Sequence, residues 1–255
     1  MTPEVSRSGG NKMTEKSGAI LQLPVSCLAE YATRGGRSPE SVLRPYKFRG
    51  AGEGIARILF RPPVVAIIRR YFKLNRDAKV FENALADWHV RADATAKKGQ
   101  RSKLQSNISA LTLFRLQYAR REFEILPAHK ISYQIGQIVF TASPDLWVRE
   151  NGQEHLIKIG FGKRSRSYID ILLAVMRRAA LAHRHRIRPR NAVYLSVLTG
   201  EELVSRFAYR DLALTLAAAA SEIVKAWPKV TQLGAVSRIG SGAGPTDVAH
   251  YSENG

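Results

Sequence analysis

The chain has 255 residues, 45% hydrophobic and 24% charged, a composition typical of globular proteins rather than disordered or fibrous ones. Its 40 Lys and Arg against 21 Asp and Glu give a formal net charge of +19, and such a surplus favours a polyanionic partner, chiefly nucleic acid. The single cysteine, Cys27, excludes an intrachain disulfide and a cysteine-rich zinc site.

The two ends of the chain differ in composition from its middle. Residues 1–17 and 234–255 are polar, contain Gly and Ser and lack periodicity, so we expect two flexible tails. No run reaches the roughly 18 apolar residues that a membrane span needs, and the first residues lack the apolar core of a signal peptide. These features predict a cytoplasmic protein without a membrane partner.

Residues 18–108 are expected to form a helical N-terminal region. Ser38 is a candidate N-cap and Pro39 suits the first helical position after it. Apolar residues at helical spacing predict further helices over residues 52–60, 62–72 and 77–96. The pattern then breaks, which predicts a basic loop that carries Lys97, Lys98, Arg101 and Lys103.

Residues 109–233 are expected to form an α/β (α+β) core. A strong helical pattern ends near Pro127, and after it the apolar period changes from 3.6 to 2. Strands are predicted over 129–136, 137–150, 153–162 and 191–200, with a further short strand over 205–209. Helices are predicted over 167–184 and 210–227. The core order is α-β-β-β-α-β, followed by a C-terminal helix.

Asn151-Gly152 predicts a β-hairpin with a two-residue type I′ turn, because both central residues of that turn need positive φ. The turn sets the register, so that Asp145 faces Lys158 and Arg149 faces Glu154. One face of the hairpin is then a core face, with Phe140, Leu146, Val148, Ile157, Ile159 and Phe161. The other face carries Asp145, Glu154 and Lys158, with Trp147 and Leu156 among them.

Pro144-Asp145 at the end of one strand, a lysine on the next, then a helix and a strand, resembles the core of the PD-(D/E)XK nuclease superfamily. The resemblance spans roughly residues 109–207. It implies that Asp145 and a second acid bind Mg²⁺ and that Lys158 orients or activates the attacking water. The preceding helix could supply a further acid, Glu122 or Glu124.

The chain departs from the family at one position, because the acid expected two residues before the lysine is Leu156. Mg²⁺ is a hard cation that usually needs one or two carboxylates. Glu154 lies on the same face, about 6.6 Å farther along the strand, and would have to replace the missing ligand. Cross-strand ion pairs, Asp145 with Lys158 and Arg149 with Glu154, explain the same residues without any catalysis.

The strongest functional signal is the density of basic residues after the hairpin. The candidate nucleic-acid-binding residues are Lys163, Arg164, Arg166, Arg177, Arg178, Arg184, Arg186, Arg188 and Arg190, and only Asp170 opposes them in this stretch. Arginine forks suit phosphate oxygens, although a solvated helix end would have a similar composition.

These observations lead to three hypotheses. The first is a nucleic-acid-binding protein, for DNA rather than RNA, with a degenerate nuclease-like core that needs no cofactor. It would act as a binding or assembly subunit of a nucleoprotein system, and the fold suggests mobile-element, phage or antiviral defence settings by analogy. The second is an active Mg²⁺-dependent nuclease that uses Asp145, Glu154 and Lys158. The third is a non-enzymatic RNA-binding or scaffolding protein.

Overall fold

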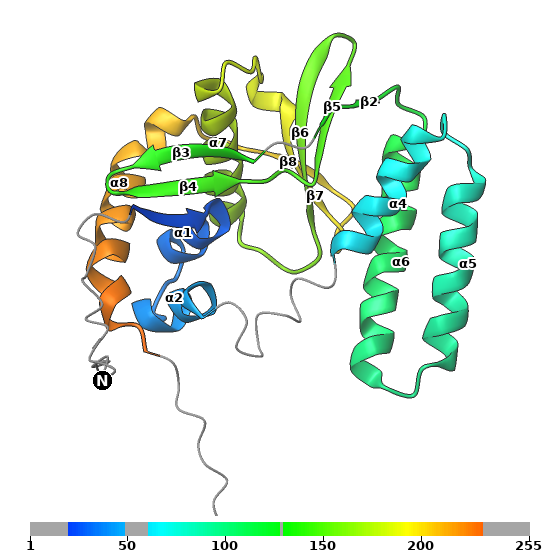
Figure 1. Cartoon of the computed structure of the whole chain (residues 1–255), viewed down its shortest axis with the longest axis horizontal. Helices are drawn as coiled ribbons and strands as arrows, with labels where there is room; N and C mark the ends of the chain where they lie inside the picture. The colour runs from blue at the N-terminus through cyan, green and yellow to red at the C-terminus, as the bar shows by residue number, and fades with distance from the viewer. Residues whose placement is uncertain (1–19, 49–60, 128–129, 232–255) are drawn as a thin grey trace, which may run out of the picture.

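The computed structural model describes residues 20–48, 61–127 and 130–231, which form a mixed α/β fold (Figure 1). The predicted tails, residues 1–17 and 234–255, and the predicted helix over 52–60 lie outside these residues. The first half contains β1 (Leu21–Pro24), α1 (Val25–Ala32), α2 (Pro39–Lys47), α4 (Arg61–Lys73), α5 (Lys79–Ala94) and α6 (Lys98–Tyr118).

The second half contains most of the strands. Its elements are β2 (Glu124–Ile125), β3 (Ile131–Ile135), β4 (Ile138–Ala142), β5 (Leu146–Glu150), β6 (Gln153–Gly160), α7 (Arg166–Ala182), η1 (Pro189–Asn191), β7 (Ala192–Ser196), β8 (Glu202–Val204), α8 (Tyr209–Ala226) and η2 (Trp227–Lys229).

The strands form two sheets. The larger sheet has the order β2-β5-β6-β7-β8, in which only β6 and β7 are parallel and are joined through α7. The smaller sheet has the order β1-β4-β3, with β1 parallel to β4. A parallel pair needs a long crossover connection, and α7 supplies it between β6 and β7.

Helices cover both faces of the larger sheet, so the protein has two cores. On one face, side chains of β5, β6 and β7 such as Val148 and Ile157 pack against α4, α5 and α6. On the other face, Trp147 and Leu156 join the core formed by α1, α7, α8 and the smaller sheet. The hairpin face that was expected to be polar is therefore largely a second core face.

Helix α7 lies between the two sheets and is buried on nearly all sides. Ser165 caps its start by accepting a hydrogen bond from the backbone N–H of Tyr168 (3.2 Å). Eleven of its residues are buried, from Tyr168 to Ala180, which is typical of a helix in the middle of a domain.

The predicted strand over residues 137–150 is wrong, because it is two strands in different sheets. β4 ends at Ala142 in the smaller sheet and β5 begins at Leu146 in the larger one. Pro144 lies between them and has no backbone N–H to donate to a ladder. Phe140, which was grouped with Leu146, belongs to the other core.

The predicted basic loop is also wrong. Helix α6 begins at Lys98 and runs to Tyr118, so Lys98, Arg101 and Lys103 lie on its first turns and Lys97 is its N-cap residue. The expected boundary between residues 108 and 109 falls inside this helix. Arg101 donates to the carbonyls of Ala92 (3.0 Å) and Thr95 (3.1 Å) and so joins α6 to the end of α5.

Two further boundaries differ from the predictions. The helix that was expected to continue to Pro127 ends at Tyr118, and β2 follows it. The final short strand is Glu202–Val204 rather than residues 205–209.

The helix start at Ser38 is confirmed, since its side chain accepts a hydrogen bond from the backbone N–H of Ser41 (3.2 Å). Within the described residues, no helix is both long and apolar enough to cross a membrane.

Candidate functional site

The Asn151-Gly152 turn has the predicted geometry. Both residues have positive φ, 48° and 72°, and Trp147 pairs with Leu156 and Arg149 with Glu154 in the ladder of β5 and β6. Asp145 lies one residue before β5, and its backbone N–H donates to the Ile157 carbonyl (2.9 Å). The hairpin register therefore brings Asp145 beside Lys158, as the sequence predicted.

Asp145 and Lys158 form a largely buried ion pair. Lys158 Nζ lies 3.1 Å from Asp145 Oδ1 and 2.8 Å from the Ser143 carbonyl oxygen, and the side chains are only 12% and 11% exposed. The second carboxylate oxygen, Oδ2, accepts a hydrogen bond from the Ile159 backbone N–H (2.8 Å). Both oxygens of Asp145 already have donors within the chain.

The residues predicted for a Mg²⁺ site are not brought together. Leu156 occupies the expected acid position and is fully buried among apolar side chains. Glu154 Oε2 accepts a hydrogen bond from Trp147 Nε1 (3.1 Å) and lies 3.0 Å from His185 Nδ1. Within residues 20–48, 61–127 and 130–231, no group of three His, Cys, Asp or Glu side chains is placed to hold a metal ion.

The other predicted acids also have separate partners. Glu124 pairs with Arg149 across β2 and β5 (2.7 Å), so the expected pair of Arg149 with Glu154 does not form. Glu122 lies 3.7 Å from Arg76 and is highly exposed. The Asp145–Lys158 pair thus has the position that the family resemblance implies, without the second acid.

Four of the predicted nucleic-acid-binding residues have partners within the protein. Arg164 pairs with the buried Glu30 (2.9 Å), and Arg166 with the buried Asp170 (3.3 Å). Arg177 Nε donates to the Ile187 carbonyl (2.9 Å), and Arg178 Nε to the Tyr133 hydroxyl (3.1 Å). These four side chains hold the fold together, whatever else they bind.

Asp170 does not neutralise the exposed basic residues. It is 1% exposed, and its carboxylate accepts hydrogen bonds from Arg206 at 2.9 and 2.7 Å in addition to its pair with Arg166. Asp170, the single acid in this basic stretch, therefore pairs with Arg166 and Arg206 inside the protein.

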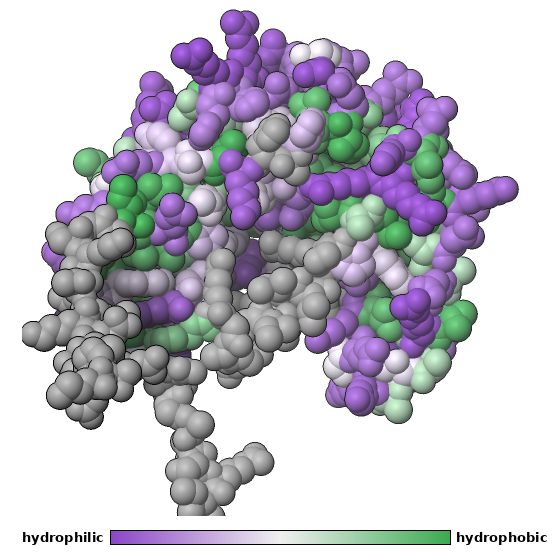
Figure 2. Space-filling view, viewed as in Figure 1, coloured by the Kyte–Doolittle hydropathy of each residue, from purple (hydrophilic) through white to green (hydrophobic). Residues whose placement is uncertain are grey.

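The remaining arginines form a row that faces solvent. Arg184, Arg186, Arg188 and Arg190, here called the arginine row, are all exposed, and within the described part of the chain none of them forms a salt bridge. Lys163 is exposed as well. Hydrophilic side chains line the upper edge of the molecule, where the end of α7 and the β5–β6 hairpin lie (Figures 1 and 2).

The two residues between the first three arginines anchor the row. His185 contacts Glu154 and packs edge-on against the Trp147 ring, with centroids 4.4 Å apart. Ile187 is 2% exposed, and its carbonyl accepts the hydrogen bond from Arg177. Side chains alternate in an extended segment, so burial of these two turns Arg184, Arg186 and Arg188 outward.

The row begins at a helix C-terminus that normally carries glycine. The N–H of Arg184 donates to the Leu181 carbonyl (3.1 Å) and that of His185 to the Ala180 carbonyl (3.0 Å), which is the Schellman pattern. Arg184 has a φ of 65° and so adopts the left-handed conformation, which costs a non-glycine residue roughly 1–2 kcal/mol. A charged side chain is thus present at a conformational cost.

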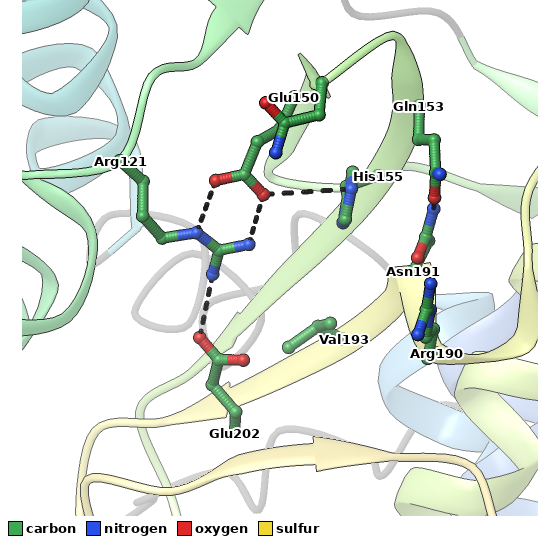
Figure 3. A pocket seen from close by; sticks show the side chains of 9 residues that line it. Arg121, Glu150, Gln153, His155, Arg190, Asn191, Val193 and Glu202 are labelled. Carbon is green, nitrogen blue, oxygen red and sulfur yellow. Dashed lines mark hydrogen bonds and ion pairs between the residues drawn. The ribbon is translucent and has the colours of Figure 1, made fainter.

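Next to the row lies a polar cavity of about 310 Å³ that sequence reasoning did not find (Figure 3). On one side, Arg121 donates to Glu150 at 2.8 and 2.5 Å and to Glu202 at 3.3 Å. On the other side are Gln153, Asn191 and Arg190, the last residue of the row. The lining residues are Arg121, Glu150, Asn151, Gln153, His155, Arg190, Asn191, Val193 and Glu202.

Neighbouring groups and burial shift the pKa values of two residues in this cavity, Glu150 and His155. Hydrogen bonds from Arg121 hold the pKa of Glu150 below its ordinary value of 4.5. Burial lowers the pKa of His155 below 6.5, against the opposing effect of Glu150, whose Oε2 lies 3.9 Å from His155 Nε2. The imidazole is therefore mainly neutral at pH 7. The hairpin register places Glu150, Gln153 and His155 on one face of the sheet. That register follows from the Asn151-Gly152 turn, so these three lining residues could have been grouped from the sequence.

No protein-family model matches this chain, and no curated protein matches it either.

Proposed function

We propose that this protein binds nucleic acid, DNA in preference to RNA, through the arginine row. The observation that carries the proposal is the row itself: Arg184, Arg186, Arg188 and Arg190 are exposed, on a segment anchored by buried neighbours. Within the described residues, no carboxylate pairs with any of the four. Guanidinium groups without an internal partner are available to phosphate oxygens, which they can bind bidentately.

The anchoring of the row supports binding as well as stability. Because the Schellman motif, His185 and Ile187 hold its backbone in place, little conformational entropy of the backbone is lost when a ligand binds. The side chains still lose rotamer freedom. A pre-ordered row of cations therefore binds a polyanion more tightly than the same four arginines in a disordered tail.

We also propose that the core is a degenerate relative of the PD-(D/E)XK nucleases that binds without cutting. The hairpin of β5 and β6, the crossover α7 and the parallel strand β7 support this relationship, as does the Asp145–Lys158 pair. Leu156 and the engaged Glu154 argue against Mg²⁺ chemistry. Such a protein would serve as a binding or assembly subunit in a cytoplasmic nucleoprotein system of the mobile-element, phage or antiviral defence type.

The binding proposal is tested by replacing all four arginines of the row with alanine. Each lost phosphate contact on duplex DNA reduces the slope of log K against log salt by about 0.9, so the slope should flatten by about 3–4. Affinity should fall similarly for unrelated sequences, because phosphate contacts carry no sequence information directly. Fluorescence anisotropy over a salt series measures both quantities.

A matched control removes four charges elsewhere. Lys79, Arg210, Lys225 and Lys229 are exposed residues of α5, α8 and η2, and their replacement by alanine changes the net charge by the same amount. This control should retain most of the affinity and slope. Equal losses of affinity and salt slope in the two variants would show that only the overall charge matters. A row variant with unchanged affinity and slope would contradict the proposal.

The absence of cleavage is tested separately. The protein should leave DNA and RNA intact with Mg²⁺ or Mn²⁺, because Leu156 provides no ligand. Cleavage that Asp145→Ala and Lys158→Ala each abolish would instead establish the active nuclease. Tighter binding of RNA than of DNA at equal length would favour the RNA-scaffolding hypothesis.

A further inference from the structure

The arginine row ends at the cavity, and the two adjoin through consecutive residues. Arg190 is both the last arginine of the row and a lining residue, and Asn191 follows it in the cavity wall (Figure 3). A polyanion that follows the row therefore reaches the cavity mouth with its backbone phosphates at Arg188 and Arg190. The cavity is placed to receive whatever group that polyanion carries next to these phosphates.

The cavity suits a group of modest size with several polar edges. Its volume of about 310 Å³ lies at the lower end of the range of ligand pockets, roughly 300–1,000 Å³. Its lining includes the amides of Asn151, Gln153 and Asn191 and the carboxylate of Glu202, so that both donors and acceptors are present. His155 is the only ring among the lining residues, so recognition would rely on hydrogen bonds more than on stacking.

Hydrogen bonds and ion pairs within the protein hold the side chains on two opposite walls of the cavity. Asn191 is 1% exposed, and its Nδ2 donates to the Glu154 carbonyl (3.1 Å) and to Gln153 Oε1 (3.4 Å). Opposite it, Arg121 holds the carboxylates of Glu150 and Glu202. Because the two walls are fixed by their own contacts, the cavity exists before any ligand binds.

We propose that this cavity receives one unpaired nucleobase of a DNA strand whose phosphates lie on the arginine row. The inference rests on the proposed function and narrows it to single-stranded DNA. A base within a duplex is stacked and paired, so it cannot enter a pocket unless it is flipped out. Single-stranded DNA meets the row and the cavity together, whereas duplex DNA engages the row alone.

The test compares three labelled probes: a single DNA strand of mixed sequence, an abasic strand with the same number of phosphates, and the blunt duplex. The wild-type protein should bind the ordinary strand about tenfold more tightly than the abasic strand, a factor typical of one recognised base. Gln153→Ala and Glu202→Gln should reduce that ratio towards one, with the affinity for the abasic strand unchanged.

The variants are chosen to preserve the fold. After Gln153→Ala, Asn191 keeps its hydrogen bond to the Glu154 carbonyl, and after Glu202→Gln, Arg121 keeps its pair with Glu150. Circular dichroism and thermal unfolding check that both remain folded. Gln105→Ala, an exposed glutamine of α6, is the matched control and should leave the ratio unchanged.

The outcomes separate this inference from the proposed function. Binding of all three probes with a wild-type ratio near one, or a ratio unchanged in both cavity variants, would overturn the base pocket alone. Binding of none of them would overturn the proposed function too. Deoxynucleoside monophosphates should compete at least about a hundredfold more weakly than the strand, because they offer the row a single phosphate. Competition as strong as that of the strand would assign the pocket to free nucleotides.

Discussion

At the scale of single residues, the Asp145–Lys158 pair connects the segment before β5 to β6. The pair is largely buried, and its hydrogen bonds tie the segment before β5 to β6 through the Ser143 carbonyl and the Ile159 N–H. Removing one partner would leave the other charge buried without compensation. The pair therefore has a role in stability that is independent of any chemistry.

We expect Lys158→Met to lower the free energy of unfolding by about 3 kcal/mol, since it leaves the Asp145 carboxylate without its cation. Urea denaturation measures the change. Arg149→Met is the control, because Arg149 and Glu124 are 42% and 60% exposed and such pairs contribute about 1 kcal/mol or less. Equal costs for the two variants would show that Lys158 behaves as a surface residue.

Glu154, the expected substitute metal ligand, contacts other side chains of the protein. Its carboxylate connects Trp147 in β5 to His185 in the arginine row. The residue expected to be the substitute metal ligand thus helps to position the arginine row. Trp147 is 1% exposed, so this connection begins inside the core.

At the scale of elements, the end of α7 determines how the arginine row is presented. The Schellman hydrogen bonds from Arg184 and His185 reverse the chain, and the extended segment that follows leads into η1 and β7. Ile187 and His185 then fix which side chains face outward. The conformation of Arg184 is the least favourable part of this arrangement, because its φ is 65°.

We expect Arg184→Gly to raise the free energy of unfolding by up to about 1 kcal/mol, since glycine adopts the left-handed conformation without the side-chain penalty. DNA affinity should fall at the same time. Arg186→Gly is the matched control, because φ is not positive there and glycine should destabilise by roughly 0.5–1 kcal/mol. Thermal and urea unfolding measure both variants, and destabilisation by Arg184→Gly would contradict the assignment.

At the scale of the whole molecule, the two cores lie on opposite faces of the larger sheet. The core of α1, α7 and α8 supports the arginine row, and the α4–α6 face of the sheet carries the cavity. Through Arg121, Glu150, His155 and Glu202, the segment after α6 is coupled electrostatically to β5, β6 and β8. The stability of the whole domain should therefore respond to pH through this cluster.

The pKa of His155 in the folded state lies below its ordinary value of 6.5, mainly because of burial. The unfolded state then binds more protons than the folded state as pH falls through 6.5, so stability falls with it. The lowered pKa of Glu150 has the same sign at lower pH, since its contribution is present above 4.5 and is lost below.

We expect His155→Gln to remove the part of the stability loss that begins as pH falls through 6.5, and to leave the part that begins below 4.5. Urea unfolding at several pH values measures both parts. The groups that face His155 are Glu150, Glu202, Arg121 and Arg190, and they remain in the variant. An identical pH profile for the variant and the wild type would assign the titration to other histidines.

The sequence by itself determined the local features of this protein. Asn151-Gly152 specified the turn and the register of β5 and β6, because only that turn type suits those residues, and so it brought Asp145 to Lys158. Ser38 specified a helix start, and the change of apolar period located most of the strands in the second half. Strand β1 (Leu21–Pro24), which pairs with β4, lies in the region that was expected to be helical, so that prediction was incomplete. The excess of arginine after the hairpin was visible from composition alone.

Only the tertiary structure decided which of those arginines have partners inside the protein. Partners distant in the chain, Glu30 for Arg164 and Tyr133 for Arg178, contact some of the predicted binding residues, whereas the arginine row forms no salt bridge within the described residues. The division of residues 137–150 between two sheets and the cavity beside Arg190 depend on long-range packing. Local patterns record propensity and spacing, whereas burial and pairing depend on contacts between segments that the sequence keeps far apart.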